Sequence, residues 1–390
     1  MNVQYDQQGN RNSLRLKVLR GDFFTSEELF QIWRTLSDKL DMFVSSTFTD
    51  THPERNISMK EALPATRALG DANGISVATV DMRYGVRNDS TLKHTTWDEC
   101  CRELMRCAVE SGGVCFLSLQ SHKYGYRPIP KRISKYNYEN RLATLSLDLQ
   151  TLSNHWYIFD QNTESYILRN LVDKDDPDFW SAQPKIRNAF AGVPFDEDVC
   201  PGLFVGQSVT ECEVQFILSN PELLKRARWL KRNLLGAIPD AVTQEEKNKA
   251  LSDGSQDHDA SSRLSALVQR MADAFASNEV PDAVKSYEIS VDAYVADPSN
   301  PERQAYLDAW KEDVTAMLTD EVSKIIQEKT QWSLDGCGLG ARGDDVAEML
   351  HHYSWAREKC SDFEGREDLL GRALQCIRSG NRTKSKGSTE

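Results

Sequence analysis

The residues with the clearest chemical potential follow a short apolar run near the start of the chain. Residues 42–44 lead directly into Ser45, Ser46 and Thr47, and Asp50 comes three residues later. This order predicts a buried strand that ends in a hydroxyl-rich turn before a helix. In open α/β sheets such a turn offers hydroxyl and backbone N–H groups to a phosphate or a ribose. The same residues also suit the end of a strand and the cap of a helix, so both interpretations stay open.

Two further turns follow apolar runs and contribute candidate residues. Arg83, Tyr84 and Gly85 come after the run at 75–82, and Gly85 would give that loop backbone freedom. Tyr124 and Gly125 follow a third apolar run, at residues 114–119. Carboxyl ends of parallel strands meet at one edge of a sheet, so we expect these groups to line one cleft. The alternative for Tyr124 is simple packing of the loop.

Other common chemistries lack the residues that they need. The seven histidines form no Ser/His/Asp or Cys/His arrangement, although His94 falls nearest to the expected cleft. None of the nine cysteines forms a C-x-x-C pair, so no metal site is predicted. The sequence also lacks the G-x-x-x-x-G-K-[ST] loop of ATPases, and we expect no ATP hydrolysis by this chain.

The first third of the chain alternates between strand and helix patterns. Strands are predicted at 41–46, 75–82 and 114–119, and helices at 51–69 and 95–110. Apolar strands separated by helices are typical of a parallel sheet with helices on both faces. The sequence therefore predicts an α/β fold.

The rest of the chain is less regular. We expect mixed structure at 156–180 and a polar loop at 243–262. A helix is predicted at 209–218, where Ser208 or Thr210 caps and precedes Glu211 and Glu213. Further helices are predicted at 131–152, 264–275 and 301–330, and further strands at 227–235 and 284–295. The predicted domains are a helical extension at 1–38, an α/β domain at 39–330 with a mostly helical insertion at about 131–262, a helical linker at 331–380 and a disordered tail at 381–390.

Composition limits the classes of partner. The net charge of −12 argues against nucleic acid and anionic membranes, because both attract an excess of Lys and Arg. The first residues lack the apolar stretch of a signal peptide, and no apolar run could span a bilayer. Together with cysteines that form no framework, these features predict a cytoplasmic protein with reduced thiols.

Several motifs together resemble one known group of proteins. They are Phe-Val-Ser-Ser-Thr-Phe-x-Asp at 43–50, Glu-Arg at 54–55, Val-Asp-Met-Arg-Tyr-Gly-Val at 80–86 and Tyr-Gly-Tyr-Arg-Pro at 124–128. They resemble the N-terminal region of NACHT and WD-repeat proteins, which are signalling ATPases of the STAND class. The chain is also similar to nephrocystin-type NACHT/TPR proteins and, more distantly, to the telomerase-associated vault protein. Residues 363–370 are similar to the segment that precedes a NACHT domain.

The resemblance implies a domain related to the Toll/interleukin-1 receptor (TIR) fold, with a flavodoxin-like parallel sheet. It implies an effector or adaptor in signal transduction and innate immunity that works by homotypic self-association and contacts with other signalling proteins. In TIR relatives the loop that matches Arg83–Gly85 mediates self-association.

Two other functions stay open. In TIR-type NAD hydrolases a glutamate faces the nucleotide, and the matching candidate is Glu103, with Glu99 in reserve. Such a carboxylate stabilises the positive charge that develops on ribose as nicotinamide leaves. The alternative for both residues is an ordinary solvated helix face. A third function is a sensor that binds a nucleotide without turnover. No cofactor is required by the first function, and NAD is the ligand or substrate that the second implies.

Overall fold

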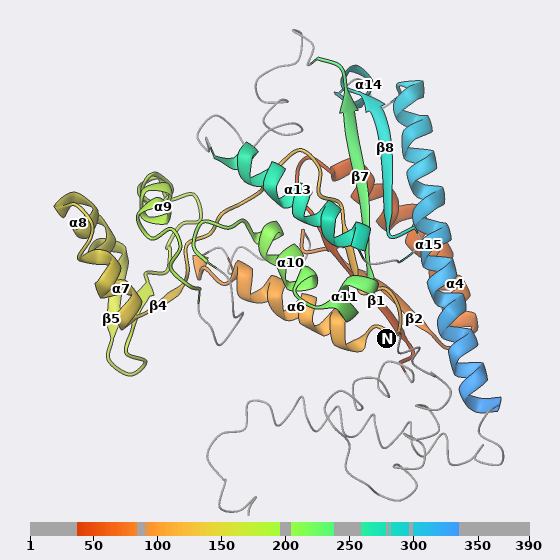
Figure 1. Cartoon of the computed structure of the whole chain (residues 1–390), viewed down its shortest axis with the longest axis horizontal. Helices are drawn as coiled ribbons and strands as arrows, with labels where there is room; N and C mark the ends of the chain where they lie inside the picture. Colours follow the sequence, from red (N-terminus) through yellow and green to blue (C-terminus); the bar gives the residue numbers. More distant parts are fainter. Residues whose placement is uncertain are drawn as a thin grey trace, which may run out of the picture. The chain divides into compact units, whose positions relative to one another are not determined.

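Five strands of the described chain form one parallel sheet in the order β2-β1-β3-β7-β8 (Figure 1). Their bounds are β1 Lys39–Ser45, β2 Ser76–Val80, β3 Phe116–Ser118, β7 Ala227–Leu235 and β8 Val284–Ser290. Numbered along the chain, these strands follow the order 2-1-3-4-5, which is that of flavodoxin-like folds. The predicted α/β class and parallel sheet are therefore confirmed.

This structure is a computed structural model, and it describes residues 37–83, 90, 92–195, 204–237, 259–277, 280, 282–295 and 299–334. The predicted N-terminal extension at 1–38 lies almost wholly outside these residues. So do the predicted disordered tail and nearly all of the linker at 331–380. Most of the polar loop expected at 243–262 also falls outside the described part.

Successive side chains of β1 pack into two separate hydrophobic cores, one on each face of the sheet. Phe43 packs into the cluster on one face of the sheet, whereas Leu40, Met42 and Val44 belong to the cluster on the other face. Successive side chains of a strand point to opposite faces, so an apolar strand must be covered twice. The sheet is consequently buried between two layers of helices.

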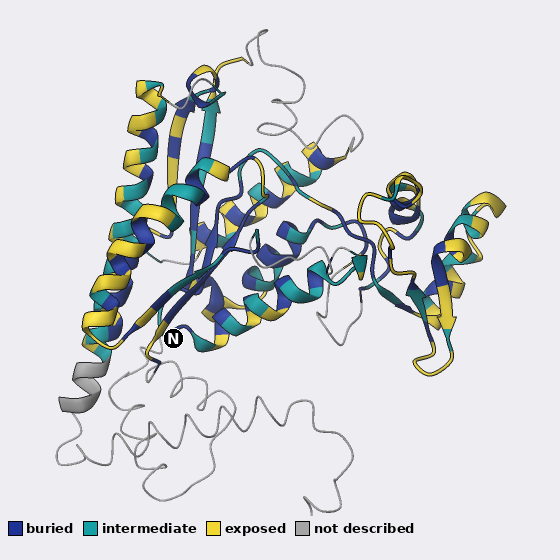
Figure 2. Ribbon diagram, turned by 180° about the vertical axis from the view of Figure 1, so that it is seen from behind, coloured by how far each residue is buried: buried dark blue, intermediate teal, exposed yellow. Residues whose placement is uncertain are grey.

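One face of the sheet is covered by α6 (Thr96–Glu110), α10 (Val209–Leu218), α11 (Pro221–Lys225) and α13 (Ala260–Ser277). The other face is covered by the first crossover helix and by α15 (Pro301–Leu334) (Figure 1). The crossover helix consists of α3 (His52–Ile57), a π-helical stretch at Ser58–Ala62 and α4 (Leu63–Ala72). Figure 2 shows exposed residues on the side of α15 that faces away from the sheet.

A small antiparallel sheet lies apart from the main one. Its order is β4-β6-β5, with β4 at Arg132–Ser134, β5 at Tyr157–Asp160 and β6 at Ser165–Leu168. Three helices accompany it: α7 (Lys135–Leu142), α8 (Leu147–Trp156) and α9 (Pro177–Ala189). The prediction of one helix over 131–152 is thus wrong at 132–134, where Ile133 pairs with Tyr166 across the sheet, and at the break after α7.

Two predicted strands in the second half of the chain are found, one of them shorter than expected. The predicted strand at 227–235 is β7, and it pairs with β3 and β8 in the main sheet although it lies within the stretch expected to be an insertion. Its two arginines are paired, since Arg228 contacts Glu321 and Arg232 contacts Glu54, and Lys231 lies over the ring of Trp229. The predicted strand at 284–295 ends early, because Ser290 accepts a hydrogen bond from the backbone N–H of Ala293 and starts α14 (Val291–Val295).

Cysteine states and membrane spans can be read from the described residues. Cys100, Cys107 and Cys212 are buried and free, and Cys115 is buried, while Cys101 is disulfide-bonded, so the prediction of reduced thiols is wrong at Cys101. Among the helices that the structure describes, none has the length and apolarity to cross a bilayer.

Candidate functional site

A cleft of about 620 Å³ opens where β1 and β3 end. These neighbouring strands carry connections that run to opposite sides, and ligands of open α/β sheets bind at such a switch point. The lining comes from the turn after β1, the loop after β3, and the helices α6, α9 and α10. The residues are Ser46, Thr47, Phe48, Thr49, Thr96, Cys100, Lys123, Gly125, Tyr126, Arg127, Trp180, Gln183, Pro184, Arg187, Val209, Thr210 and Glu213.

The turn after β1 reaches the cleft through two of the predicted residues, Ser46 and Thr47. The hydroxyl of Ser46 accepts a hydrogen bond from Arg55 Nη1 at 2.7 Å and lies 2.8 Å from the hydroxyl of Thr51. Thr47 donates its hydroxyl proton to the carboxylate of Asp50. These bonds fix the turn, so its polar groups are already in place at the cleft.

The cap interpretation of this turn does not hold in its simple form. Thr51 is the N-cap residue of α3, and its side chain makes no capping hydrogen bond. Asp50 is 1 % exposed and accepts the backbone N–H of His122 at 3.2 Å, so it joins the turn to the loop after β3. Burial raises the pKa of Asp50 above its ordinary value. Asp50 does not line the cleft and supports it from behind.

Glu213 is the residue at the cleft that sequence reasoning missed. It lies on α10, is 4 % exposed, and accepts the hydroxyl proton of Ser45 at 2.6 Å. Burial raises the pKa of Glu213 to about 7, although the Ser45 hydrogen bond and the charge of Arg55 oppose this shift. A carboxyl group with this pKa can hold or release a proton near neutral pH.

In the sequence, Glu213 belongs to the pattern of Ser208, Glu211 and Glu213 that predicts the start of the helix at 209–218. Ser208 does cap α10, because its hydroxyl accepts the backbone N–H of Glu211 at 3.1 Å. The carboxylate of Glu211 accepts a hydrogen bond from the hydroxyl of Tyr124 and forms an ion pair with Arg270. Two residues further along the helix, Glu213 turns to the cleft. The helix before the fourth strand of the sheet therefore carries the carboxylate, and not the helix before the third.

Glu103 and Glu99, the predicted catalytic and reserve glutamates, do not line the cleft. Both lie on α6. Glu103 accepts a hydrogen bond from Arg106 Nε at 2.9 Å, and its side chain is 35 % exposed. Glu99 accepts the hydroxyl proton of Ser90 at 2.6 Å. The solvated-face interpretation describes Glu103 well, since it forms an ion pair one helical turn from its partner.

The other predicted binding residues separate into different places. Gly125 lines the cleft with φ at +98°, and a Cβ built there would lie 2.9 Å from Thr47 Cγ2. Tyr124 is fully buried behind it, where burial raises its pKa well above the usual value. Arg83 forms an ion pair with Asp81 and does not reach the cleft. Tyr84 and Gly85 lie outside the described residues.

A buried ion pair underlies the turn after β1. Arg55 and Asp81 are both about 1 % exposed at their side chains and contact each other directly. Burial alone would raise the pKa of Asp81, but hydrogen bonds from Arg83 and the charge of Arg55 hold it below its ordinary value. Because Arg55 also donates to Ser46, this pair ties the ends of β1 and β2 together.

Charged and aromatic side chains line the cleft. Its cations are Lys123, Arg187 and Arg127, of which Arg127 is buried and paired with Asp259, and its rings are Phe48, Tyr126 and Trp180. Cations attract phosphate, and rings stack on bases. The described residues contain no group of histidine, cysteine and acidic side chains that could hold a metal ion.

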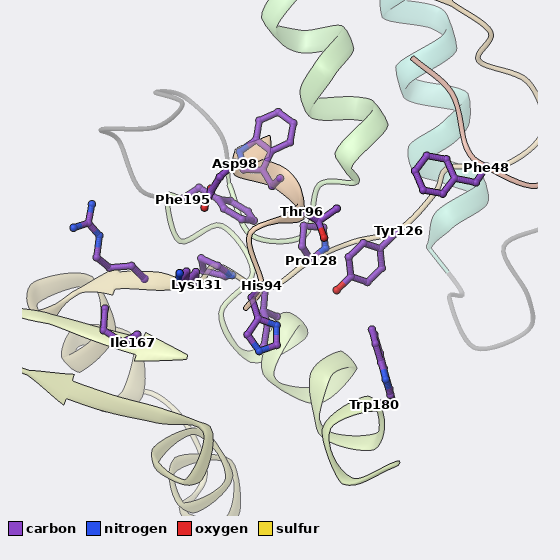
Figure 3. A pocket seen from close by; sticks show the side chains of 14 residues that line it. Phe48, His94, Thr96, Asp98, Tyr126, Pro128, Lys131, Ile167, Trp180 and Phe195 are labelled. Atoms are coloured by element: carbon purple, nitrogen blue, oxygen red, sulfur yellow. The ribbon is translucent and has the colours of Figure 1, made fainter. Parts of the chain in front are cut away.

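A second cavity of about 570 Å³ adjoins the cleft. It lies between the start of α6 and the small sheet, and Figure 3 shows Phe48, Tyr126 and Trp180 at one end, with Lys131, Ile167 and Phe195 at the other. Phe48, Thr96, Tyr126 and Trp180 line both spaces.

Comparison with known proteins supports the predicted relation. The chain is 26 % identical over 347 residues to mouse NACHT domain- and WD repeat-containing protein 1, which covers 83 % of the chain and 21 % of that protein. The human protein of the same name is 24 % identical and covers 78 % of the chain and 20 % of its own length. Rat telomerase protein component 1 is 32 % identical over 96 residues, 25 % of the chain and 3 % of that protein.

The chain thus spans about a fifth of the length of the NACHT and WD-repeat relatives that it matches. No protein-family model and no solved structure matches it. The similarity to nephrocystin-type proteins stays a prediction.

Proposed function

We propose that this chain is a signalling module of the NACHT and WD-repeat type, an effector or adaptor that acts through protein assembly and is controlled by a nucleotide-class ligand. The similarity to NACHT and WD-repeat proteins over most of the chain supports the first part. The switch-point cleft carries the second part. Its volume of about 620 Å³ falls within the range of small-molecule sites.

The chemistry of the cleft favours a nucleotide over a simple anion. Ser46, Thr47 and the loop at Gly125 bring hydroxyl and backbone groups to the place where a phosphate or ribose binds in this class of sheet. Lys123 adds a cation at the rim, where its ammonium group donates to Thr49 Oγ1 at 2.8 Å. Tyr126 and Trp180 add rings that can stack on a base.

Calorimetric titration of the purified chain tests ligand binding. ADP-ribose, ADP, AMP and inorganic phosphate form a series of probes. We expect saturable binding of at least one nucleotide, and Lys123→Ala should weaken it about tenfold, because one charge-assisted hydrogen bond is lost. Lys60→Ala is the matched control, since Lys60 is an exposed cation on the opposite helix layer. Absence of saturable binding for every probe would contradict the proposal.

The assembly part has its own test. Sedimentation velocity across a concentration series, with and without the tightest probe, measures self-association directly. We expect mass to rise with concentration and to depend on the ligand. A monomer under every condition would remove homotypic assembly from the proposal and leave other signalling proteins as the partners to search for.

A second candidate function is cleavage of NAD at the nicotinamide–ribose bond, and Glu213 favours it. This carboxyl group lines the cleft, whereas Glu103 does not. Ionised Glu213 would stabilise positive charge on the ribose as nicotinamide leaves. Its raised pKa means that the ionised fraction grows through neutral pH.

Chromatographic measurement of nicotinamide distinguishes the candidates. If the chain cleaves NAD, Glu213→Gln should abolish release and Glu103→Gln should leave it unchanged. Release that persists in Glu213→Gln but disappears in Glu103→Gln would restore the assignment that the sequence suggested. No release by the unmodified chain at any concentration would leave the ligand-controlled adaptor.

A further inference from the structure

We infer that a second copy of this chain pairs with the outer edge of β5 across a two-fold axis, so that two small sheets join into one. This inference rests on the homotypic assembly in the proposed function and names the surface that carries it. In the sheet order β4-β6-β5, β5 is an outer strand, and Figure 1 shows it on the side away from the main sheet. Among the described residues, no strand pairs with its outer edge.

The backbone groups that point outward from β5 follow from its pairing with β6. The backbone N–H of Arg169 donates to the carbonyl of Trp156 at 2.9 Å, in register with the pairs of β5 and β6. In an antiparallel pair, alternate residues direct both backbone groups to the same neighbour. Ile158 therefore faces β6, whereas Tyr157 and Phe159 face outward. The N–H of Tyr157 bonds back into α8, so the outer edge offers one carbonyl at Tyr157 and both groups of Phe159.

This pattern of donors and acceptors is self-complementary. If two β5 strands run antiparallel with Ile158 at the axis, the N–H of Phe159 in each copy donates to the carbonyl of Tyr157 in the other. A two-fold interface needs such a patch, because the same surface has to match itself. Ile158 then lies opposite its own counterpart at a non-hydrogen-bonded position, where cross-strand side chains are closest.

Apolar side chains continue across this axis on both faces of the joined sheet. On one face, Ile167 and Ile158 are cross-strand neighbours, and the axis extends them into a row of isoleucines from both copies. On the other face, the rings of Tyr166 and Phe159 have centroids 5.2 Å apart, and Tyr157 of the second copy continues the row. Ile158 is 47 % exposed and Phe159 is 36 % exposed, so pairing removes large apolar side chains from water.

The other sheet edges of the described chain carry charged groups, which hinder the addition of a strand. On β2, the guanidinium of Arg67 occupies the carbonyl of Val77 at 2.9 Å. An exposed Glu288 lies on β8, and β4 begins with Arg132. The residues of β5 that would pair with a second copy carry no charge. Because β5 has 4 residues and buries less area than a standard interface, we expect a weak dimer that forms at raised concentration.

Charged substitutions at Ile158 test the axis, because this residue would face its own counterpart. Ile158→Lys and Ile158→Glu each place like charges opposite one another, so each should weaken association about tenfold in sedimentation velocity. An equal mixture of the two variants places opposite charges across the axis, and association should return. Val172→Lys is the matched control, since Val172 is 99 % exposed and follows β6 without belonging to the sheet.

Oxidative cross-linking adds a measurement that is independent of affinity. Ile158→Cys should give a covalent dimer, because Cα atoms of a non-hydrogen-bonded pair lie about 4.5 Å apart, within the range that a disulfide spans. Val172→Cys, treated in the same way, should give no more dimer than the unmodified chain. Circular dichroism and thermal midpoints verify that each variant is folded.

The outcomes separate this surface from assembly in general. Recovery in the mixture, together with the cross-link at Ile158, supports pairing of β5 with a second copy. Association that persists in each charged variant alone overturns this surface and leaves homotypic assembly intact. Loss in both variants without recovery in the mixture overturns the two-fold register and indicates another segment on this edge. A monomer at every concentration of the unmodified chain overturns both proposals.

Discussion

Glu213 shows how burial can dominate the chemistry of one side chain. The carboxyl group is 4 % exposed, and it accepts hydrogen bonds from the hydroxyl of Ser45 at 2.6 Å and from Cys100. These neutral hydrogen bonds and the charge of Arg55 offset only part of the hydration that a carboxylate loses in the interior. Protonation is therefore favoured, and the pKa of Glu213 rises to about 7.

This raised pKa makes the stability of the protein depend on pH. The folded state holds the proton of Glu213 up to a pKa of about 7, while the unfolded chain releases it near the ordinary value of 4.5. The contribution of Glu213 to the stability is therefore fully present below the pKa of the unfolded state, and it is lost as the pH rises through the pKa of the folded state. Glu213→Gln removes the ionisable group and with it this pH dependence. The free energy of unfolding of the variant, relative to that of the unmodified chain, should therefore rise by roughly 2 to 3 kcal/mol between pH 5 and pH 8.

Urea unfolding of both proteins at several pH values gives this difference. Glu103→Gln is the control, because Glu103 is partly exposed and contacts Arg106. Parallel pH profiles for the unmodified chain and Glu213→Gln would mean that the carboxyl group is already ionised in the folded state.

The sequence indicated only the local half of this site. Ser46 and Thr47 could be predicted because they directly follow an apolar run, and the end of a parallel strand is a known place for ligands. Glu213 lies 168 residues from Ser45 and comes to it only through the packing of α10 on β1. No periodicity within one segment carries that information.

At the scale of elements, the turn after β1 and the loop after β3 depend on one position without a side chain. Gly125 has φ at +98°, and a Cβ there would lie 2.9 Å from Thr47 Cγ2 and 3.2 Å from Thr210 Oγ1. The glycine thus allows the loop to approach both the β1 turn and the start of α10. These are the elements that bring polar groups to the cleft.

Gly125→Ala should destabilise the protein more than Gly74→Ala does. Both glycines have positive φ, but a Cβ at Gly74, with φ at +66°, would meet nothing within 4 Å. Backbone strain should cost about 1 kcal/mol at either position, and the close contacts at Gly125 should add roughly 1 to 2 kcal/mol. Chemical denaturation measures both. Equal losses would show that Thr47 and Thr210 move aside freely.

Elements were predictable where their pattern is local. The helix at 209–218 follows from a capping signal, whereas the strand at 227–235 was predicted although it carries several charges. The short strands β4, β5 and β6 were missed, since three or four residues carry too little periodicity. Their stability comes from contacts between segments, such as Phe159 and Tyr166, which pair across β5 and β6 with ring centroids 5.2 Å apart.

At the scale of the whole described domain, one long helix shares the covering of a sheet face with the crossover helix. Six large apolar side chains of α15 are buried at spacings of three or four residues, which places them on one stripe. They are Tyr306, Trp310, Val314, Leu318, Val322 and Ile325. The predicted helix at 301–330 is therefore confirmed as α15, and the stripe packs it on the sheet.

Trp310 is the largest side chain of this stripe and is 1 % exposed. Trp310→Ala should lower the free energy of unfolding by about 3 to 5 kcal/mol, through lost burial and the cavity that remains. Glu312→Ala, on the exposed side of the same helix, should change it by less than about 0.5 kcal/mol. Urea denaturation of both variants measures the contrast. Similar small losses would mean that α15 contributes little to holding the sheet.

The buried carboxylate of Glu54 gives the order of chain synthesis a physical meaning. Its partners Arg232, Tyr294 and Tyr306 lie 178, 240 and 252 residues further along the chain. At ribosomal rates of about 5 to 20 residues per second, Glu54 is made roughly ten to fifty seconds before Tyr306. Closing such long loops is also entropically unfavourable. Glu54 therefore emerges without the side chains that pair with it, and its complete set of partners forms only after α15 has left the ribosome.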